Sequence, residues 1–287
     1  MNDVMMSGMG TDLCPILTKE EMRAKAPYVF AKEPTNPKVS GKYVFADTET
    51  IIDDLAKLGW GVVDCKQQRK NKRSNIHSLH MVSFQHPEVY ITKEDENGNE
   101  IVDCFPRIIL LNAHDGCHCF KFMIGIYRIV CSNGLIVASE QFADISIRHS
   151  NYDFEELRKV VAVAIKNVSD NISIMNDMQA TELTAEQKNE LAISALKIRK
   201  GLKNEDTFKA DGEDIEDLLT PIRKEDEGNS LWNVFNILQE KIIKGNYSMT
   251  SPTNHKVRKA RAIKGVSKDI EINQRLFSVA SSYRQAA

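Results

Sequence analysis

Hydrophobic positions change their spacing along the chain, from alternation in the first half to a helical repeat in the second. Apolar or alternating runs bounded by polar turns predict strands, which occupy Trp60–Gln68, Ser78–Phe84, Arg107–Leu111, Cys119–Cys131 and Asp144–Arg148. Hydrophobic residues three or four positions apart predict helices, which occupy Thr48–Leu58, Phe154–Met178, Thr184–Gly201, Gly212–Leu219, Leu231–Ile243 and Asp269–Tyr283. Because the strands largely precede the helices, we expect an α+β fold with an antiparallel sheet and a mainly helical C-terminal half.

Local signals mark the ends of some of these elements. Thr18 with Glu21, and Thr184 with Gln187, have the spacing of a capping box at the start of a helix. The polar and basic segment 246–266 shows no such signal and no period, so we expect a loop there.

The expected domain organisation is simple. Residues 1–40 are expected to form a flexible N-terminal arm with one short helix, because the prolines Pro27, Pro34 and Pro37 interrupt it. Since no low-complexity linker divides the remainder, residues 41–287 are expected to form a single α+β domain. Its sheet-rich half covers 41–150 and its helical half covers 151–287.

Charge changes this picture more than composition does. The chain has 287 residues, 42% hydrophobic and 27% charged, and its net charge of −2 indicates no partner. Two short segments are nevertheless dense in cations, and an acidic segment, 205–227, lies between them. The first cation cluster contains Lys66, Arg69, Lys70, Lys72 and Arg73. The second contains Lys256, Arg258, Lys259, Arg261 and Lys264.

The first cation cluster joins two predicted strands, which is the pattern of a protruding β-hairpin with a basic tip. Lysine and arginine on such an element would neutralise phosphates and release counterions, so both clusters are candidate nucleic-acid contacts. The alternative is a solvated loop that charge keeps soluble. The second cluster contains no aromatic residue, so it would hold the backbone and would not stack on bases.

The cysteine and histidine residues offer a different chemistry. The six cysteines form no Cys-x-x-Cys pair, which favours reduced thiols in the bacterial cytoplasm. His114, Asp115, Cys117, His118 and Cys119 could be metal ligands, but zinc ligands usually come as two separated pairs. We therefore expect no metal and no cofactor, and a β-turn in which His114 and Asp115 bond the backbone.

Catalytic motifs and membrane spans are not expected. Cys131 could act as a nucleophile if His114 or His149 served as its base. An apolar strand precedes Cys131, however, and this favours a buried, inert thiol. The sequence has no G-x-S-x-G, H-E-x-x-H or Walker-type G-x-x-x-x-G-K-[ST] motif, so we expect no enzyme activity. The most apolar stretch, 120–136, is too short and too polar to cross a bilayer.

Several segments together resemble a known family. They are Thr48–Trp60, Gln67–Arg69, Leu111–Gly116, Tyr127–Leu135, Ile147–His149, Leu231–Asn236 and Asn273–Phe277. In these segments the chain resembles the phage/plasmid-like protein family, catalogued as domain of unknown function 932. The resemblance covers about 44–283, departs from the family pattern at Cys117–Cys119, and implies carriage by phages or plasmids.

The resemblance also nominates residues, although it assigns them no established activity. Those that match the family pattern are His114, Asp115, Gly116, Arg128, Cys131, Asn133, Gly134 and His149. Their implied role is structural, as a buried polar network that fixes the sheet and a turn. Arg128 on an apolar strand needs a partner, and Asp115 is the candidate.

Three hypotheses for function follow. The first is a DNA-binding accessory protein for recombination or replication, because a basic hairpin, antiparallel strands and a long helix are also the outline of single-strand annealing proteins. Its partner would be single-stranded DNA, with self-association left open. The second is a factor that inhibits a host defence protein through the acidic segment. The third is a metal-dependent enzyme.

Overall fold

The structure of the protein is a computed structural model, and it describes residues 4–5, 15–32, 45, 47–68, 77–94, 97–115, 120–128, 134–137, 146–147, 154–203, 208, 210, 212–250 and 256–284. The chain divides into two compact units, Met1–Asp170 and Asn171–Ala287, which we call unit 1 and unit 2 and describe separately. Helix α4 (Phe154–Ala180) crosses this division. The expected organisation as a single domain stays a prediction.

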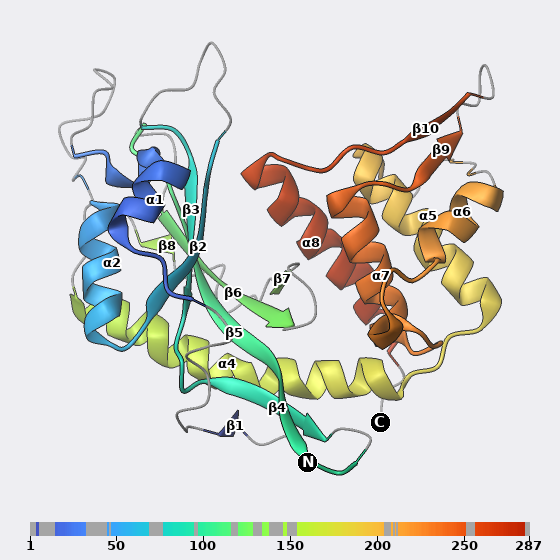
Figure 1. Cartoon of the computed structure of the whole chain (residues 1–287), viewed down its shortest axis with the longest axis horizontal. Helices are drawn as coiled ribbons and strands as arrows, with labels where there is room; N and C mark the ends of the chain where they lie inside the picture. Colours follow the sequence, from blue (N-terminus) through green and yellow to red (C-terminus); the bar gives the residue numbers. More distant parts are fainter. Residues whose placement is uncertain are drawn as a thin grey trace. The chain divides into compact units, whose positions relative to one another are not determined.

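Unit 1 is built on an antiparallel sheet (Figure 1). Its strands are β1 (Val4–Met5), β2 (Gly61–Gln67), β3 (His80–Gln85), β4 (Tyr90–Glu94), β5 (Glu100–Asn112), β6 (Phe120–Arg128), β7 (Gly134–Val137) and β8 (Ser146–Ile147). The long strand β5 organises the sheet, because it pairs with β4 along its first part, with β3 along its second part, and with β6. The expected hairpin is present as the antiparallel pair β2 and β3.

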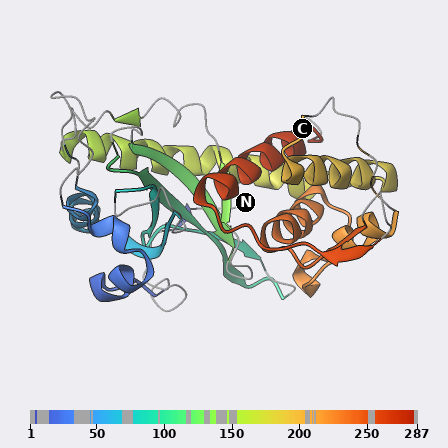
Figure 2. The same cartoon turned by 90° about the horizontal axis from the view of Figure 1, so that it is seen from above.

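Helices cover one face of this sheet. They are α1 (Lys19–Lys25), the 3-10 turn η1 (Pro27–Phe30), α2 (Thr48–Lys57) and the beginning of α4. Alternate strand residues such as Phe84, Ile108 and Phe122 form one buried cluster with Leu55 of α2 and Leu157 of α4. In Figure 2 the first part of α4 runs alongside the strands. Each element therefore buries the apolar face that its own periodicity predicts.

Within the segment 1–40 expected to be a flexible arm, residues 15–32 pack on the sheet of unit 1, and the flexibility of the rest stays a prediction. Thr18 and Glu21 form the predicted capping box, and α1 begins at the next residue, Lys19. Met22 and Val29 are buried in the core of unit 1, and Tyr28 is buried beside them. Pro27 begins η1 just after the end of α1, and the buried apolar side chains around it hold this part of the chain on the sheet. Pro34 and Pro37 lie outside the described residues.

Unit 2 is mainly helical. Its elements are α5 (Ala185–Lys200), α6 (Gly212–Leu219), the 3-10 turn η3 (Lys224–Asp226), α7 (Leu231–Lys244), β9 (Ser248–Thr250), β10 (Val257–Lys259) and α8 (Val266–Ser281). The predicted capping box of Thr184 and Gln187 opens α5. Phe235 of α7 packs against Phe277 of α8, with ring centroids 6.1 Å apart, in the core of this unit.

The segment 246–266 is not the loop that its polarity predicted. It contains β9 and β10, which pair antiparallel and form a ribbon (Figure 1). Gly245 at the end of α7 makes the ribbon possible, since its φ is +79° and a Cβ there would lie 2.5 Å from the carbonyl oxygen of Ala260. The prediction failed because all three residues of β10 are exposed, so the strand has no alternation of burial to read.

The fold class is confirmed as α+β, with an antiparallel sheet followed by a mainly helical C-terminal half. Strands β4 and β7 were not among the strands predicted from the sequence. Among the helices of the described ranges, none combines the length and apolar character that crossing a bilayer requires.

Candidate functional site

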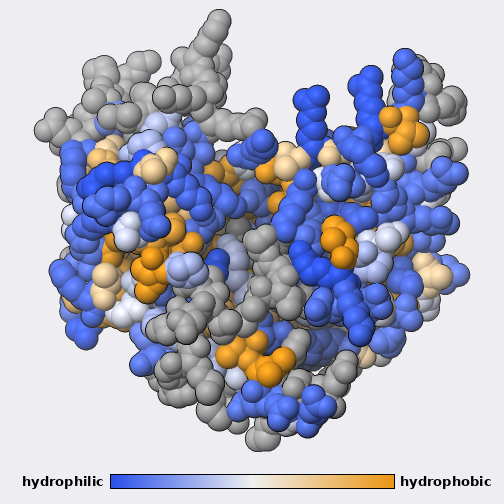
Figure 3. All heavy atoms as spheres, in the orientation of Figure 1, coloured by the Kyte–Doolittle hydropathy of each residue, from blue (hydrophilic) through white to orange (hydrophobic). Residues whose placement is uncertain are grey.

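The second cation cluster lies on and beside the β9–β10 ribbon. Register pairs Arg258 with Met249 and Lys259 with Ser248, which places both cations on the strand β10. Lys256, Arg258, Lys259, Arg261 and Lys264 are all exposed. Hydrophilic side chains project from the region of this ribbon in the space-filling view (Figure 3). The segment 246–266, expected to be a loop, therefore contains an antiparallel strand pair that carries exposed cations.

The C-terminal end of α5 adds to this surface. Arg199 donates a hydrogen bond from Nη2 to the carbonyl oxygen of Arg261, which ties the end of α5 to the chain just after β10. The exposed cations Lys200 and Lys203 follow Arg199 along the chain. Lys268 of α8 approaches the same helix end, since its Nζ lies 3.8 Å from the position of a Cβ on Gly201. Sequence reasoning missed this contribution because it joins residues 62 positions apart.

Acidic helix α6 binds the other strand of the ribbon. Asp217 accepts a hydrogen bond from the backbone N–H of Ser248 (2.7 Å), and Asp214 accepts one from the backbone N–H of Thr250 (2.6 Å). Two carboxylates one helical turn apart thus bind alternate N–H groups of β9. Asp217 also pairs with Lys259 at 3.0 Å. The acidic segment therefore contacts the second cation cluster within unit 2.

The first cation cluster is described only at its start. Lys66 lies near the end of β2 and is exposed. Arg69, Lys70, Lys72 and Arg73 lie outside the described residues. Because the first cluster belongs to unit 1 and the second to unit 2, their convergence into one surface stays a prediction.

A buried polar cluster joins α2 to the sheet of unit 1. His80 and Asn112 are directly opposite each other on β3 and β5, and Thr48 in the first turn of α2 lies over them. The hydroxyl oxygen of Thr48 is 2.9 Å from His80 Nε2, 2.9 Å from Asn112 Nδ2 and 3.3 Å from His114 Nε2. All four side chains are fully buried.

Proton counting fixes the direction of each of these bonds. His80 Nδ1 lies 3.2 Å from the carbonyl oxygen of Ser78, which can only accept, so Nδ1 carries the proton of a neutral ring. His80 Nε2 then accepts from the hydroxyl of Thr48. The Thr48 oxygen in turn accepts from Asn112 Nδ2 and from a protonated His114 Nε2. Every hydrogen-bonding position of the Thr48 hydroxyl is thereby used.

Burial also determines the charge state of this cluster. It lowers the pKa of His80 from 6.5 to about 4, although the bond to the Ser78 carbonyl opposes the change. Burial also lowers the pKa of His77, whose backbone carbonyl accepts from the backbone N–H of His114. A hydroxyl beside a neutral histidine is the arrangement of an activated nucleophile. Here both lone pairs of Thr48 are occupied, which favours a structural role.

The residues nominated by family resemblance have different outcomes. His114 lies in the buried cluster, where the centroid of its ring is 4.5 Å from that of Phe45, and its expected bond to the backbone stays a prediction. Asp115 follows it and is partly exposed. Gly134 begins β7, and Arg128 ends β6 with only its backbone described, so its pairing with Asp115 stays a prediction.

The remaining nominated residues, Gly116, Cys131, Asn133 and His149, lie outside the described residues, as do Cys117, His118 and Cys119. Within the ranges that the structure covers, no three His, Cys, Asp or Glu side chains gather in a way that could hold a metal ion.

Comparison with known proteins places this fold in a family. A profile described as "Domain of unknown function (DUF932)" matches residues 37–276, which includes α2, the whole span from β2 to β8, and the β9–β10 ribbon. The chain belongs to the DUF932 family.

Two curated relatives of this DUF932 protein come from Escherichia coli (strain K12). They are the UPF0380 protein YfjQ and the UPF0380 protein YafZ. Each is 28% identical over 270 residues, which is 93% of this chain and 91% of the relative. No solved structure matches the chain.

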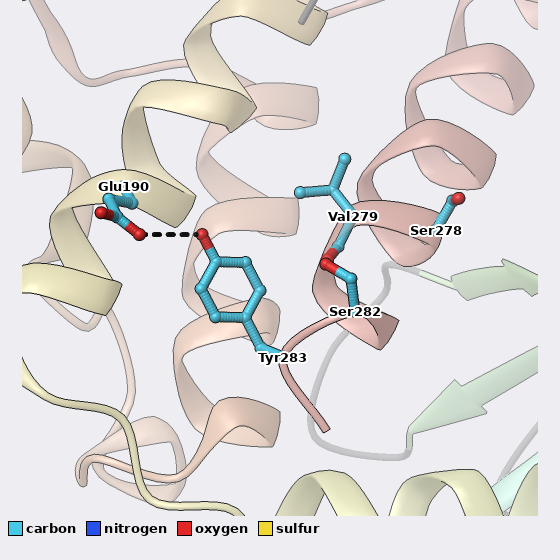
Figure 4. Close-up of a pocket in the computed structure, with 5 residues that line it drawn as sticks. All are labelled: Glu190, Ser278, Val279, Ser282 and Tyr283. Atoms are coloured by element: carbon cyan, nitrogen blue, oxygen red, sulfur yellow. Dashed lines mark hydrogen bonds between the residues drawn. The ribbon is translucent and has the colours of Figure 1, made fainter. Parts of the chain in front are cut away.

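One hollow of this DUF932 protein lies near the end of the family match. It has a volume of about 550 Å³, lies between α5 and α8, and is lined by Glu190, Ser278, Val279, Ser282 and Tyr283 (Figure 4). The hydroxyl of Tyr283 donates to Glu190 Oε2 at 3.4 Å, and burial, followed by the charge of Glu190, raises the pKa of Tyr283. No predicted site residue lies here, because the pair is 93 positions apart and forms no local motif.

Proposed function

We propose that this protein binds single-stranded DNA through the β9–β10 ribbon, as a phage- or plasmid-encoded accessory factor in recombination or replication. The observation that carries the proposal is the ribbon itself, on which Arg258 and Lys259 are presented by an exposed strand. Cations on a raised element can follow a phosphate backbone without contacting base edges. The choice of single strands rests on the likeness of the fold outline to single-strand annealing proteins.

Charge density supports the same proposal. Lys256 and Arg261 flank β10 along the chain, and the end of α5 adds Lys200, since Arg199 beside it bonds Arg261. This local concentration of cations occurs in a chain whose net charge is −2, so general electrostatic attraction would not bring DNA to it. Binding would depend on this surface and would be steeply sensitive to salt.

Binding of a fluorescein-labelled oligothymidylate, followed by anisotropy between 50 and 300 mM salt, tests the proposal. Affinity should fall steeply with salt, because about 0.7 of a counterion is released for each phosphate contact on a single strand. Arg258→Met should weaken binding and make the salt dependence shallower. Lys224→Met on η3 is the matched control, since Lys224 is an exposed cation of unit 2 that does not belong to the ribbon strands.

The same titration with duplex DNA of equal length measures strand preference. Failure of the wild-type protein to bind either DNA at 50 mM salt would refute the proposal. Equal weakening by Arg258→Met and Lys224→Met would refute the assignment to the ribbon.

The rival proposal, inhibition of a host protein through the acidic segment, receives less support. Asp214 and Asp217 already bind N–H groups of β9 and the ammonium of Lys259 within unit 2. These carboxylates are therefore engaged inside the molecule. Recovery of a nuclease-resistant host partner that is lost in Glu213→Gln/Glu216→Gln, two other acidic residues of α6, would revive this proposal.

A further inference from the structure

The Asp217 carboxylate occupies an anion-binding position made by the ribbon and α7. Its donors are the backbone N–H of Ser248 (2.7 Å), Nζ of Lys259 (3.0 Å) and Nζ of Lys241 (3.3 Å). Hydrogen bonding from Ser248 is the largest cause that lowers the pKa of Asp217, and the two lysines add to it against the effect of burial. The chain's own carboxylate thus binds where an external anion would also be attracted.

The two lysines at this position differ in burial. The side chain of Lys241 is 6% exposed and also donates to the backbone carbonyl of Asp217, whereas that of Lys259 is 58% exposed. A buried ion pair resists separation because the partner left behind is an uncompensated charge. An exposed ion pair contributes little and is readily exchanged with solvent ions. Lys241 is therefore fixed on Asp217, and Lys259 is exchangeable.

We propose that Lys259 is held by Asp217 in the free protein and transfers to a phosphate when nucleic acid binds. This inference rests on the proposed function and adds its regulation. Asp217 stays neutralised by Lys241 and bonded to Ser248 N–H during the transfer, so α6 keeps its place on β9. Asp217 is an internal competitor that lowers the affinity of the ribbon for phosphate.

A charge-neutral double variant isolates this competition. Asp217→Asn keeps a side-chain oxygen for the Ser248 N–H, and Lys241→Met replaces the buried lysine with an apolar chain of similar length, which proteins often tolerate. The net charge of D217N/K241M equals that of the wild type, yet Lys259 has lost its carboxylate. Affinity for the oligothymidylate should rise by about two- to fivefold, the range expected for release of one exposed ion pair.

Two further variants control the result. Adding Lys259→Met to the double variant should remove the gain. Glu155→Gln/Arg158→Met removes an exposed ion pair of α4 without changing net charge and should leave affinity unchanged. Thermal unfolding followed by circular dichroism establishes that each variant is folded.

If D217N/K241M unfolds, the salt dependence of Lys259→Met alone decides. A slope shallower by about 0.7 than that of the wild type supports contact of Lys259 with phosphate, and an unchanged slope overturns it. A folded double variant with unchanged or weaker affinity also overturns this inference, while the proposed function stands. Absence of binding by the wild type overturns the proposed function, and this inference with it.

Discussion

In two regions of this DUF932 protein, polar side chains hold a helix against a strand, but the two regions use different chemical groups. In unit 1, Thr48 of α2 bonds His80 and Asn112 with neutral groups that are fully buried. In unit 2, the carboxylates of Asp214 and Asp217 on α6 bond β9, and solvent partly reaches Asp217 whereas Asp214 is buried. We call the contact of Thr48 with His80, Asn112 and His114 the inner joint, and the contact of Asp214 and Asp217 with β9 the outer joint. Because burying a charge is costly, the inner joint is neutral and fixed, whereas the outer joint is ionic and includes the exchangeable Lys259.

Removing the Thr48 hydroxyl should have the largest effect on stability. Thr48→Val keeps the shape of the side chain but leaves His80, Asn112 and His114 without their shared partner. Buried groups that lose a hydrogen bond destabilise by about 1–3 kcal/mol each, so we expect the free energy of unfolding in urea to fall by about 3 kcal/mol or more. Thr48→Ser retains the hydroxyl and should lose less than about 1 kcal/mol. Equal losses in the two variants would show that packing, and not the hydroxyl, holds α2.

Acid should weaken the inner joint next. The pKa of His80 in the folded protein, about 4, lies below its ordinary value of 6.5. The unfolded chain therefore binds the proton first as pH falls, and the stability contributed by neutral His80 is fully present above pH 6.5. It is lost progressively between pH 6.5 and 4, by about 3 kcal/mol in total.

Urea unfolding of the wild type and His80→Gln at a series of pH values measures this loss. His80→Gln should be less stable at pH 7.5 but less sensitive to acid between pH 6.5 and 4. Parallel pH profiles for the two proteins would show that other groups cause the acid sensitivity.

The fixed part of the outer joint should matter less. Asp214 accepts from both the N–H (2.6 Å) and the hydroxyl (2.9 Å) of Thr250. Asp214→Ala should reduce the free energy of unfolding of the whole chain by about 1–2 kcal/mol, whereas Asp214→Asn, which keeps an acceptor, should lose about half as much. Hydrogen exchange at Thr250 should be faster in Asp214→Ala, and unchanged exchange there would contradict the assigned bond.

The smallest effect is expected at Lys259. Because its ion pair with Asp217 is exposed, Lys259→Met should change the free energy of unfolding by less than about 1 kcal/mol, and by less still at high salt. A loss above 2 kcal/mol would mean that the outer joint depends on Lys259 and that this residue is not exchangeable. Urea unfolding at 50 and 500 mM salt provides the measurement.

Local signals predicted much of the fold. The capping boxes at Thr18 and Thr184 needed only residues three positions apart, and both are present. The boundaries of α6, Gly212–Leu219, agree with its sequence pattern because the helix carries its own apolar face. The sheet order around β5 did not follow from any pattern, since pairing joins strands that are distant along the chain.

The contacts of the two joints could not be predicted from local signals either, because they also join residues that are distant along the chain. Thr48 meets His80 and His114 across 32 and 66 positions, and Asp217 meets Lys259 across 42. The sequence nominated Lys259 and His114 by charge density and by family resemblance, respectively, but it indicated neither partner. The ribbon itself was missed because exposed polar strands lack the hydrophobic alternation by which a strand is recognised.

Strand β10 pairs with β9 along one edge, and its other edge pairs with no strand of the described residues. An exposed strand edge can pair with the same edge of another molecule, and closely spaced like charges are a common protection against this. Lys256, Arg258 and Lys259 lie beside the exposed Val257, so their charges would oppose pairing of this edge with the same edge of a second copy. Variants that neutralise these cations all at once would invite aggregation, which makes single substitutions the cleaner design.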